Sequence, residues 1–301
     1  MKWIPGRRSA NLEDRRGASG GGGLGGGGFG FGGGGGGGGR GMGGGKIGLG
    51  GIVILLILSV VFKQDFLGLG GGGGTAVAPA AGEQAAPLQD EREEPLVQFV
   101  SFVLDDAQGF WKKSLPQMGT EYRDATLVVF RDATDTACGF GESATGPFYC
   151  PGDEKVYIDL AFFDELRQKF KAPGDFAQAY VLSHEIGHHV QKLLGTSEQV
   201  QRAQQGNRGS ANELSVRLEL QADCYAGVWA ASAAQRDKLD PGDTEEGLAA
   251  AAAVGDDRLQ KVATGRVSPE SWTHGSSAQR IEWFNRGFKA GDPRSCDTFG
   301  R

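Results

Sequence analysis

The stretch His184-Glu185-Ile186-Gly187-His188 sets two histidines four positions apart, with a glutamate directly after the first of them. On an α-helix, residues i and i+4 lie about one turn apart on the same face, so both imidazole rings can reach one metal ion. Glu185 lies at the edge of that face, where its carboxylate can act as a general base on a water molecule at the metal. The pattern therefore predicts a zinc site carried by a helix.

The other histidines are few. The chain has four histidines in total, and three of them fall in this one segment. His189 points about 100° away from His188 around a helix, so we predict a surface or supporting group rather than a ligand. His274 precedes the last predicted helix. It is either a donor to the oxyanion of a tetrahedral intermediate or an ordinary loop histidine.

Glu219 and Asp223 are the candidates for the remaining positions of the site. A catalytic zinc takes three protein ligands and leaves its fourth position to water. Glu219 and Asp223 are again four positions apart, beside the apolar residues of a predicted helix. We assign Glu219 to the metal and Asp223 to the free ring nitrogen of a zinc histidine, which such a carboxylate orients. There are two alternatives. In the first, Asp223 binds the metal and Glu219 does not. In the second, both residues lie on a solvated helix face and neither binds the metal.

Glycine divides the chain into two unequal parts. Of its 53 glycines, 32 fall in residues 1–74, a composition that cannot build a packed core. We predict residues 1–46 to be a disordered glycine-rich cytoplasmic tail and residues 67–93 to be a linker. Residues 94–301 are long enough for one ordinary globular domain.

A run of 16 residues without a charged side chain extends from Ile47 to Phe62. It is slightly short of the ~20 residues expected for a membrane span, but snorkelling of Lys63 or extension to about Leu69 closes the gap. The alternative is a cleaved signal peptide, which usually begins near the N-terminus, whereas 46 residues precede this run. We therefore predict a retained transmembrane signal anchor at residues 47–66.

Charge is also unevenly distributed. Residues 1–46 carry seven basic and two acidic side chains, a net charge of +5, and the whole chain carries −6, which leaves −11 for the remainder. Basic residues before the span place the N-terminus in the cytoplasm of a single-pass inner-membrane protein and the domain outside it. The acidic domain argues against nucleic acid as its partner.

The four cysteines all follow the apolar run, and an even number in an exported domain is compatible with disulfides. Cys138 and Cys150 bracket a loop that contains glycine and proline, which makes them a plausible pair. Cys224 and Cys296 pair only by elimination. No C-x-x-C spacing that would indicate zinc binding by cysteine occurs.

Periodic apolar residues predict an α+β fold in which helices dominate over a small sheet. We predict strands at 127–130 and 155–159 and a polar loop at 196–211. The predicted helices span residues 95–115, 160–170, 175–194, 212–234, 245–263 and 276–290.

Several motifs together resemble the bacterial neutral zinc metallopeptidase family, and the resemblance covers nearly the whole chain. They are Met1-Lys2-Trp3, Arg7-Arg8, residues 11–17, 137–139, 146–151, 183–191, 219–227 and 273–277. The H-E-x-x-H, the E-x-x-x-D and the later histidine are also similar to those of gluzincins. This resemblance implies a zincin-like domain in which His184, His188 and Glu219 bind zinc and Glu185 is the base. It also favours His274 as a group that stabilises the transition state.

The expected activity is hydrolysis of a peptide bond in a peptide or protein substrate. The strand at 126–130 would offer its edge to an extended peptide. One alternative is a membrane-tethered, zinc-stabilised binding or assembly module without turnover, although such a module would not need Glu185. Another is a zinc hydrolase that acts on substrates other than peptides.

Overall fold

The computed structural model describes residues 1–17, 86–143 and 146–300. Helices dominate this part of the chain and a small sheet accompanies them, as the α+β prediction required. The helices are α2 (Ala86–Ser114), α3 (Ala161–Gln168), α4 (Asp175–Leu193), α5 (Thr196–Gly206), α6 (Ala211–Gln235), α7 (Asp243–Ala253), α8 (Asp256–Thr264) and α9 (Ser277–Ala290). The strands are β1 (Leu12–Asp14), β2 (Thr126–Phe130), β3 (Ala133–Thr136), β4 (Gly139–Glu142), β5 (Phe148–Cys150) and β6 (Lys155–Asp159).

The main sheet has the strand order β1-β2-β6-β5, and β3 and β4 form a separate antiparallel hairpin. β2 pairs in parallel with both β1 and β6, and β5 runs antiparallel to β6. β2 is therefore a central strand, and nearly all of its side chains are buried. The prediction that residues 126–130 offer a free edge to a peptide is wrong, because β1 already occupies that edge.

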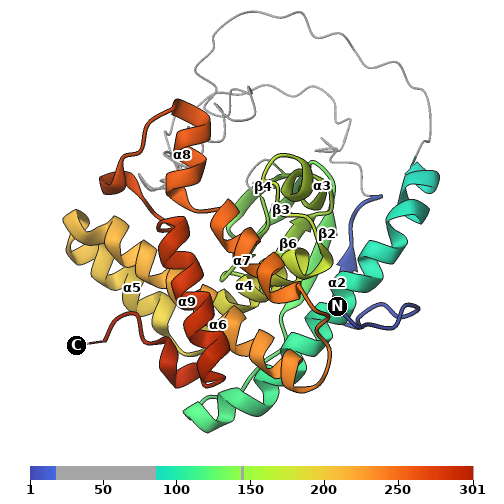
Figure 1. The fold of residues 1–301 in the computed structure, drawn as a ribbon, viewed down its shortest axis with the longest axis horizontal. Helices are drawn as coiled ribbons and strands as arrows, with labels where there is room; N and C mark the ends of the chain where they lie inside the picture. The colour runs from blue at the N-terminus through green and yellow to red at the C-terminus, as the bar shows by residue number, and fades with distance from the viewer. Residues whose placement is uncertain (18–85, 144–145, 301) are drawn as a thin grey trace, which may run out of the picture.

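Helix α4 lies in the middle of the helical layer and packs against α2, α6 and α7 (Figure 1). Nearly all of its own apolar side chains are buried, including Phe176, Tyr180, Ile186 and Val190. α9 packs closely along α6, where Gly227 and Gly287 bring the two backbones together. This packing fixes the relative positions of the two helices that carry the predicted ligands.

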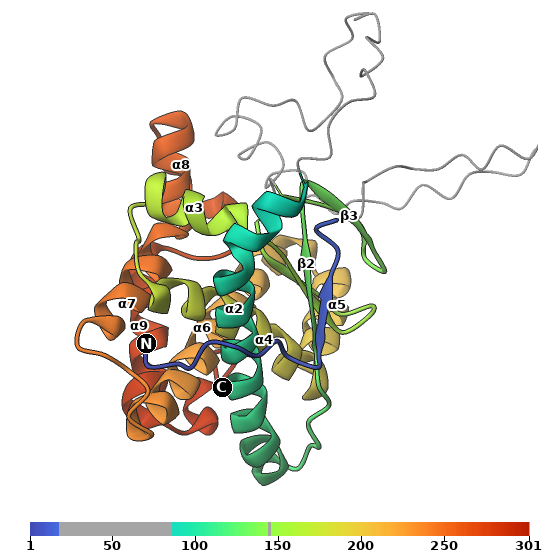
Figure 2. The ribbon, with the colours of Figure 1, turned by 90° about the vertical axis from the view of Figure 1, so that its right-hand side faces the viewer.

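The N-terminal segment, residues 1–17, is part of this fold. Figure 2 shows it crossing α2 and then running beside β2, where Leu12–Asp14 form β1. The prediction of a disordered tail is therefore wrong for residues 1–17. Composition suggested a continuous tail, but the ordered part comes before the long glycine tract and carries side chains that the domain binds.

Two helical regions also differ from prediction. Residues 196–206 form α5, because the polar segment there is rich in good helix formers and buries Val200. The helix predicted at 245–263 is broken into α7 and α8 at Gly255, whose backbone is extended. A side chain at Gly255 would overlap Ser277, so the close approach of α9 requires glycine at the break.

Both predicted disulfides are confirmed, Cys138–Cys150 and Cys224–Cys296. In the part of the chain that the structure describes, no helix has both the length and the apolar character needed to span a bilayer. The prediction of a linker is wrong for residues 86–93, which form the start of α2. The span predicted at 47–66 and the rest of the predicted tail and linker lie outside the described residues.

Candidate metal centre

His184 and His188 on α4 and Glu219 on α6 converge on one point. Each offers a ligand atom, and these atoms all lie within 4.8 Å of one another. Nε2 of His184 is 3.2 Å from Oε2 of Glu219, and Nε2 of His188 is 3.5 Å from its Oε1. The ligands that the sequence spacing proposed are therefore adjacent in space, although 30 residues of chain separate the two helical motifs.

This arrangement fits zinc. Nitrogen and oxygen atoms at about 2.1 Å from a tetrahedral zinc are about 3.4 Å from each other. The separations of 3.2 Å and 3.5 Å agree with that value. Two neutral imidazoles and one carboxylate are also a donor set common in catalytic zinc sites, and they leave one position free.

Each histidine is oriented through its other nitrogen. Nδ1 of His184 lies 2.8 Å from Oδ1 of Asp223, and Nδ1 of His188 lies 2.9 Å from Oε1 of Gln191. With Nδ1–H donating to these oxygens, both rings present Nε2 toward Glu219. Asp223 thus lies where the sequence predicted an orienting carboxylate, and the alternative with Asp223 as ligand and Glu219 as bystander does not match this geometry.

Asp223 is itself held by Arg280 and Tyr180. The Arg280 guanidinium donates to both carboxylate oxygens of Asp223, at 2.8 and 2.9 Å, and the Tyr180 hydroxyl donates to one of them. Asp223 is fully buried, which by itself would raise its pKa, but the charges and hydrogen bonds of Arg280 and His184 together outweigh burial and lower the pKa to about 2. The carboxylate is therefore ionised and fixed in place.

Arg280 and Tyr180 were not predicted to belong to the site. A weak signal exists for Arg280, which lies four and eight residues before Phe284 and Phe288 and so falls on the apolar stripe of α9. A charged residue in such a stripe needs a buried partner. Sequence alone does not say that the partner is Asp223 on another helix.

Glu185 lies beside the ligands and is only 8% exposed. Burial raises its pKa above the usual value for a glutamate, and the neighbouring His188 and His184 partly oppose this rise. Its position next to the metal ligands suits a group that accepts a proton from water.

His189 is fully buried, which excludes the surface alternative, and it is not one of the three residues whose ligand atoms converge. Its Nδ1 lies 2.9 Å from the hydroxyl of Tyr149 on β5, and its Nε2 lies 2.7 Å from the carbonyl oxygen of Arg123. Both ring nitrogens are thus engaged away from the ligand cluster. His189 connects the metal-binding helix to β5 and to the loop before β2.

His274 lies near the ligands but outside their group. Its burial lowers its pKa, but the charge of Glu219 together with Asp256 outweighs burial and raises it. Asp256 organises this loop, because its Oδ2 accepts the backbone N–H groups of Thr273, His274 and Gly275. The predicted role of His274 in the reaction stays a prediction.

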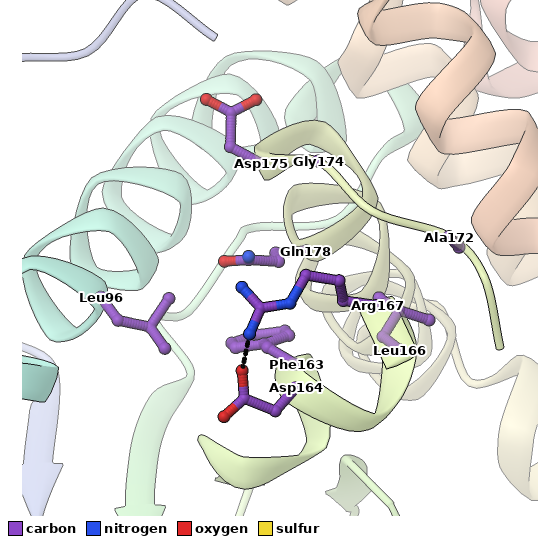
Figure 3. A pocket seen from close by; sticks show the side chains of 9 residues that line it. All are labelled: Leu96, Phe163, Asp164, Leu166, Arg167, Ala172, Gly174, Asp175 and Gln178. Atoms are coloured by element: carbon purple, nitrogen blue, oxygen red, sulfur yellow. Dashed lines mark hydrogen bonds and ion pairs between the residues drawn. The ribbon is translucent and has the colours of Figure 1, made fainter. Parts of the chain in front are cut away.

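A separate cavity of about 330 Å³ lies between α2, α3 and the first turn of α4 (Figure 3). Leu96, Phe163 and Gln178 line it, and Arg167 pairs with Asp164 at its wall. None of the three ligands lines this cavity. The candidate metal centre is therefore separate from this cavity. Its chemistry depends on the side chains of His184, His188 and Glu219.

Comparison with known proteins agrees with this geometry. The profile of the family described as "Putative neutral zinc metallopeptidase" matches residues 1–299. This chain belongs to that family. The resemblance seen in the sequence is confirmed, and the family description supports a zinc peptidase in general terms, whereas the narrower gluzincin assignment stays a prediction.

Two relatives illustrate how far the similarity extends. YpfJ of Escherichia coli K12 is 45% identical over 304 residues, which cover all of this chain and 99% of that protein. Rv2575 of Mycobacterium tuberculosis H37Rv is 49% identical over 200 residues, 63% of this chain and 66% of that protein. Both are described as uncharacterized, so neither supplies a substrate. No solved structure matches the chain significantly.

Proposed function

We propose that this protein is a zinc-dependent endopeptidase. The observation that carries the proposal is the convergence of His184, His188 and Glu219 within 4.8 Å, with the buried Glu185 beside them. A site that only stabilised the fold would close all four zinc positions with protein ligands. Three ligands and an adjacent carboxylate instead suit hydrolysis.

Each residue has a defined part in this reaction. His184, His188 and Glu219 would hold the zinc, which when bound acidifies a water molecule and polarises the scissile carbonyl. Glu185 takes the proton from the attacking water and passes it to the leaving amine. Asp223 and Gln191 keep the imidazole rings in the required orientation. His274 donates to the oxyanion that develops on the carbonyl.

An extended peptide substrate would pair with β5 and not with β2, whose edges are both occupied. β5 ends the main sheet on the side opposite β1, and Tyr149 connects it to His189 on the metal-binding helix. A peptide added there would lie close to α4. Backbone pairing along a strand edge gives affinity without strict sequence preference.

The test compares wild-type protein with Glu185→Gln and with the control Glu282→Gln, which changes an exposed glutamate on α9. We expect about one zinc per chain in all three proteins. Peptide cleavage should fall by about 10²–10⁴-fold in Glu185→Gln only, since general-base catalysis contributes that much. Metal analysis and a mixed peptide library with mass-spectrometric readout provide both measurements.

Two outcomes would contradict the proposal. Cleavage that survives in Glu185→Gln would remove this residue as the base. Zinc-loaded wild-type protein that cleaves nothing in the library would favour the binding module without turnover. Anchoring by residues 47–66, with the N-terminus in the cytoplasm and the domain outside, stays a prediction that this experiment does not address.

A further inference from the structure

We propose that residues 1–17 are a constitutive part of the zinc-binding domain, so that both lie on the same side of the cytoplasmic membrane. This topology differs from the single-pass arrangement that charge and hydropathy predict. It rests on the contacts of residues 1–17 and does not depend on the proposed peptidase activity.

The first observation is that residues 1–17 complete the main sheet. Leu12, Glu13 and Asp14 pair in parallel with Leu127, Val128 and Val129 of β2, and the backbone of Arg15 continues the pairing with a hydrogen bond of 2.7 Å to Val129. β2 is a nearly fully buried strand. Without β1, its backbone N–H and C=O groups on this side would lack partners, which is costly for a buried strand.

The second observation is that the segment buries side chains against the domain. Trp3 packs edge-to-face on Phe99 of α2, with ring centroids 5.4 Å apart. Ser9 is 7% exposed and donates a hydrogen bond of 2.6 Å to Asp105. A loosely attached tail would not exclude water from polar groups in this way.

The third observation concerns Arg16, whose side chain is only 2% exposed. Its guanidinium contacts Asp14 at 2.7 Å and Glu93 of α2 at 2.9 Å. Arg8 likewise pairs with Glu94 and with Asp14. A buried arginine with two carboxylate partners is expensive to separate from them, so the segment is not expected to detach easily.

At the start of the segment, the α-ammonium group of Met1 lies in an acidic cluster. It is 2.7 Å from Asp175, 3.3 Å from Asp243 and 3.4 Å from Asp240. Asp175 and Asp243 are the first residues of α4 and α7. The carboxylates of Asp175, Asp243 and Glu246 resemble a second metal cluster, but this positive charge already lies among them.

These contacts bear on how the basic residues near the N-terminus are interpreted. The positive-inside rule takes them as groups held in the cytoplasm. In the structure, Lys2, Arg8, Arg15 and Arg16 are engaged in ion pairs. Lys2 binds Asp237, and Arg8 and Arg16 bind Glu94 and Glu93. These four positive charges therefore have carboxylate partners within the folded protein.

Whether the number of membrane crossings is even or odd follows from the two ends of the intervening chain. Residues 17 and 91 both belong to one folded body, so residues 18–90 must cross a membrane an even number of times. The two disulfides indicate that the shared compartment is an oxidising one.

The first experiment compares the sidedness of the segment and the domain in the full-length chain expressed in bacteria. Ile4→Cys and Val262→Cys place single thiols at positions that are 87% and 74% exposed. The four native cysteines are all in disulfides and do not react. We expect a membrane-impermeant maleimide, applied to intact spheroplasts, to label both variants or neither. Labelling of one variant alone before permeabilisation would overturn the proposal.

The second experiment asks whether the segment is docked on the domain in those same spheroplasts. In Ser9→Cys/Asp105→Cys the two thiols replace side chains that are 2.6 Å apart, so a mild permeant oxidant should join them. We expect a reducible shift in gel mobility for the double variant in most of the molecules, and none for either single variant. Absence of this cross-link, even with equal labelling in the first experiment, would overturn the proposal.

Discussion

At the scale of single residues, the metal centre depends on a chain of buried polar contacts that ends at Arg280. Arg280 holds Asp223, and Asp223 orients His184. The spacing of the ligands along α4 and α6 could be predicted, because it follows from helical geometry alone. Arg280 could not, because its partner lies on a different helix that only packing brings near.

The variant Arg280→Met tests this contact. It leaves the ionised Asp223 buried without its main partner, so we expect the free energy of unfolding to fall by about 3–5 kcal/mol. Zinc affinity should also fall by about 10–100-fold, since His184 loses its fixed orientation. Arg286→Met is the matched control, because Arg286 is exposed on the same helix. Chemical unfolding and competition with a zinc chelator measure the two effects, and equal behaviour of both variants would contradict this role.

At the scale of secondary-structure elements, glycines decide how closely α6 and α9 approach. A side-chain carbon at Gly287 would overlap the carbonyl oxygen of Cys224, and one at Gly227 would overlap that of Phe284. The six predicted helices could be located from apolar periodicity, although one of them proved to be two helices. That periodicity does not reveal which glycines merely lie in a helix and which allow two backbones to touch.

The same substitution at two glycines should therefore have opposite effects. Gly287→Ala forces α9 away from α6, and we expect a loss of about 3 kcal/mol or more of folding free energy, the upper range for overpacking. Gly109→Ala in α2 meets nothing within 4 Å, so better helix propensity should add about 0.5–1 kcal/mol. Thermal and urea unfolding of both variants provide the measurement. A neutral Gly287→Ala would show that the helices do not depend on this close contact.

At the scale of the whole molecule, residues 1–17 connect the sheet, α2 and the start of α4. The Arg16 hydrogen bond is the main cause that lowers the pKa of Asp14 from 3.8 to about 2, although partial burial opposes it. Because the pKa is lower in the folded state, this contact stabilises the fold at pH values above 3.8. Its contribution decreases as the pH falls below 3.8 and is lost near pH 2.

We therefore expect Asp14→Asn to lower the free energy of unfolding by about 1 kcal/mol at neutral pH, a typical upper value for a partly exposed ion pair. The gap between wild type and variant should stay constant down to about pH 4 and narrow below it. Urea titrations between pH 7 and pH 2.5 measure this gap, with Glu91→Gln at an exposed position of α2 as the control. A gap that is unchanged at pH 2.5 would exclude Asp14 as its source.

The sequence by itself indicated the helix that carries His184 and His188, the candidate ligand Glu219, the candidate orienting residue Asp223 and a plausible pairing of the four cysteines. These depend on spacing along one helix, on simple elimination among four cysteines and on a motif set that identifies the family. The tertiary structure decided the central position of β2, the burial of His189 and the role of Arg280. It also placed residues 1–17 on the domain. Each of these depends on contacts between segments far apart in the chain. Local composition, which suggested a disordered tail, and family resemblance, which suggested a free strand edge, do not specify such contacts.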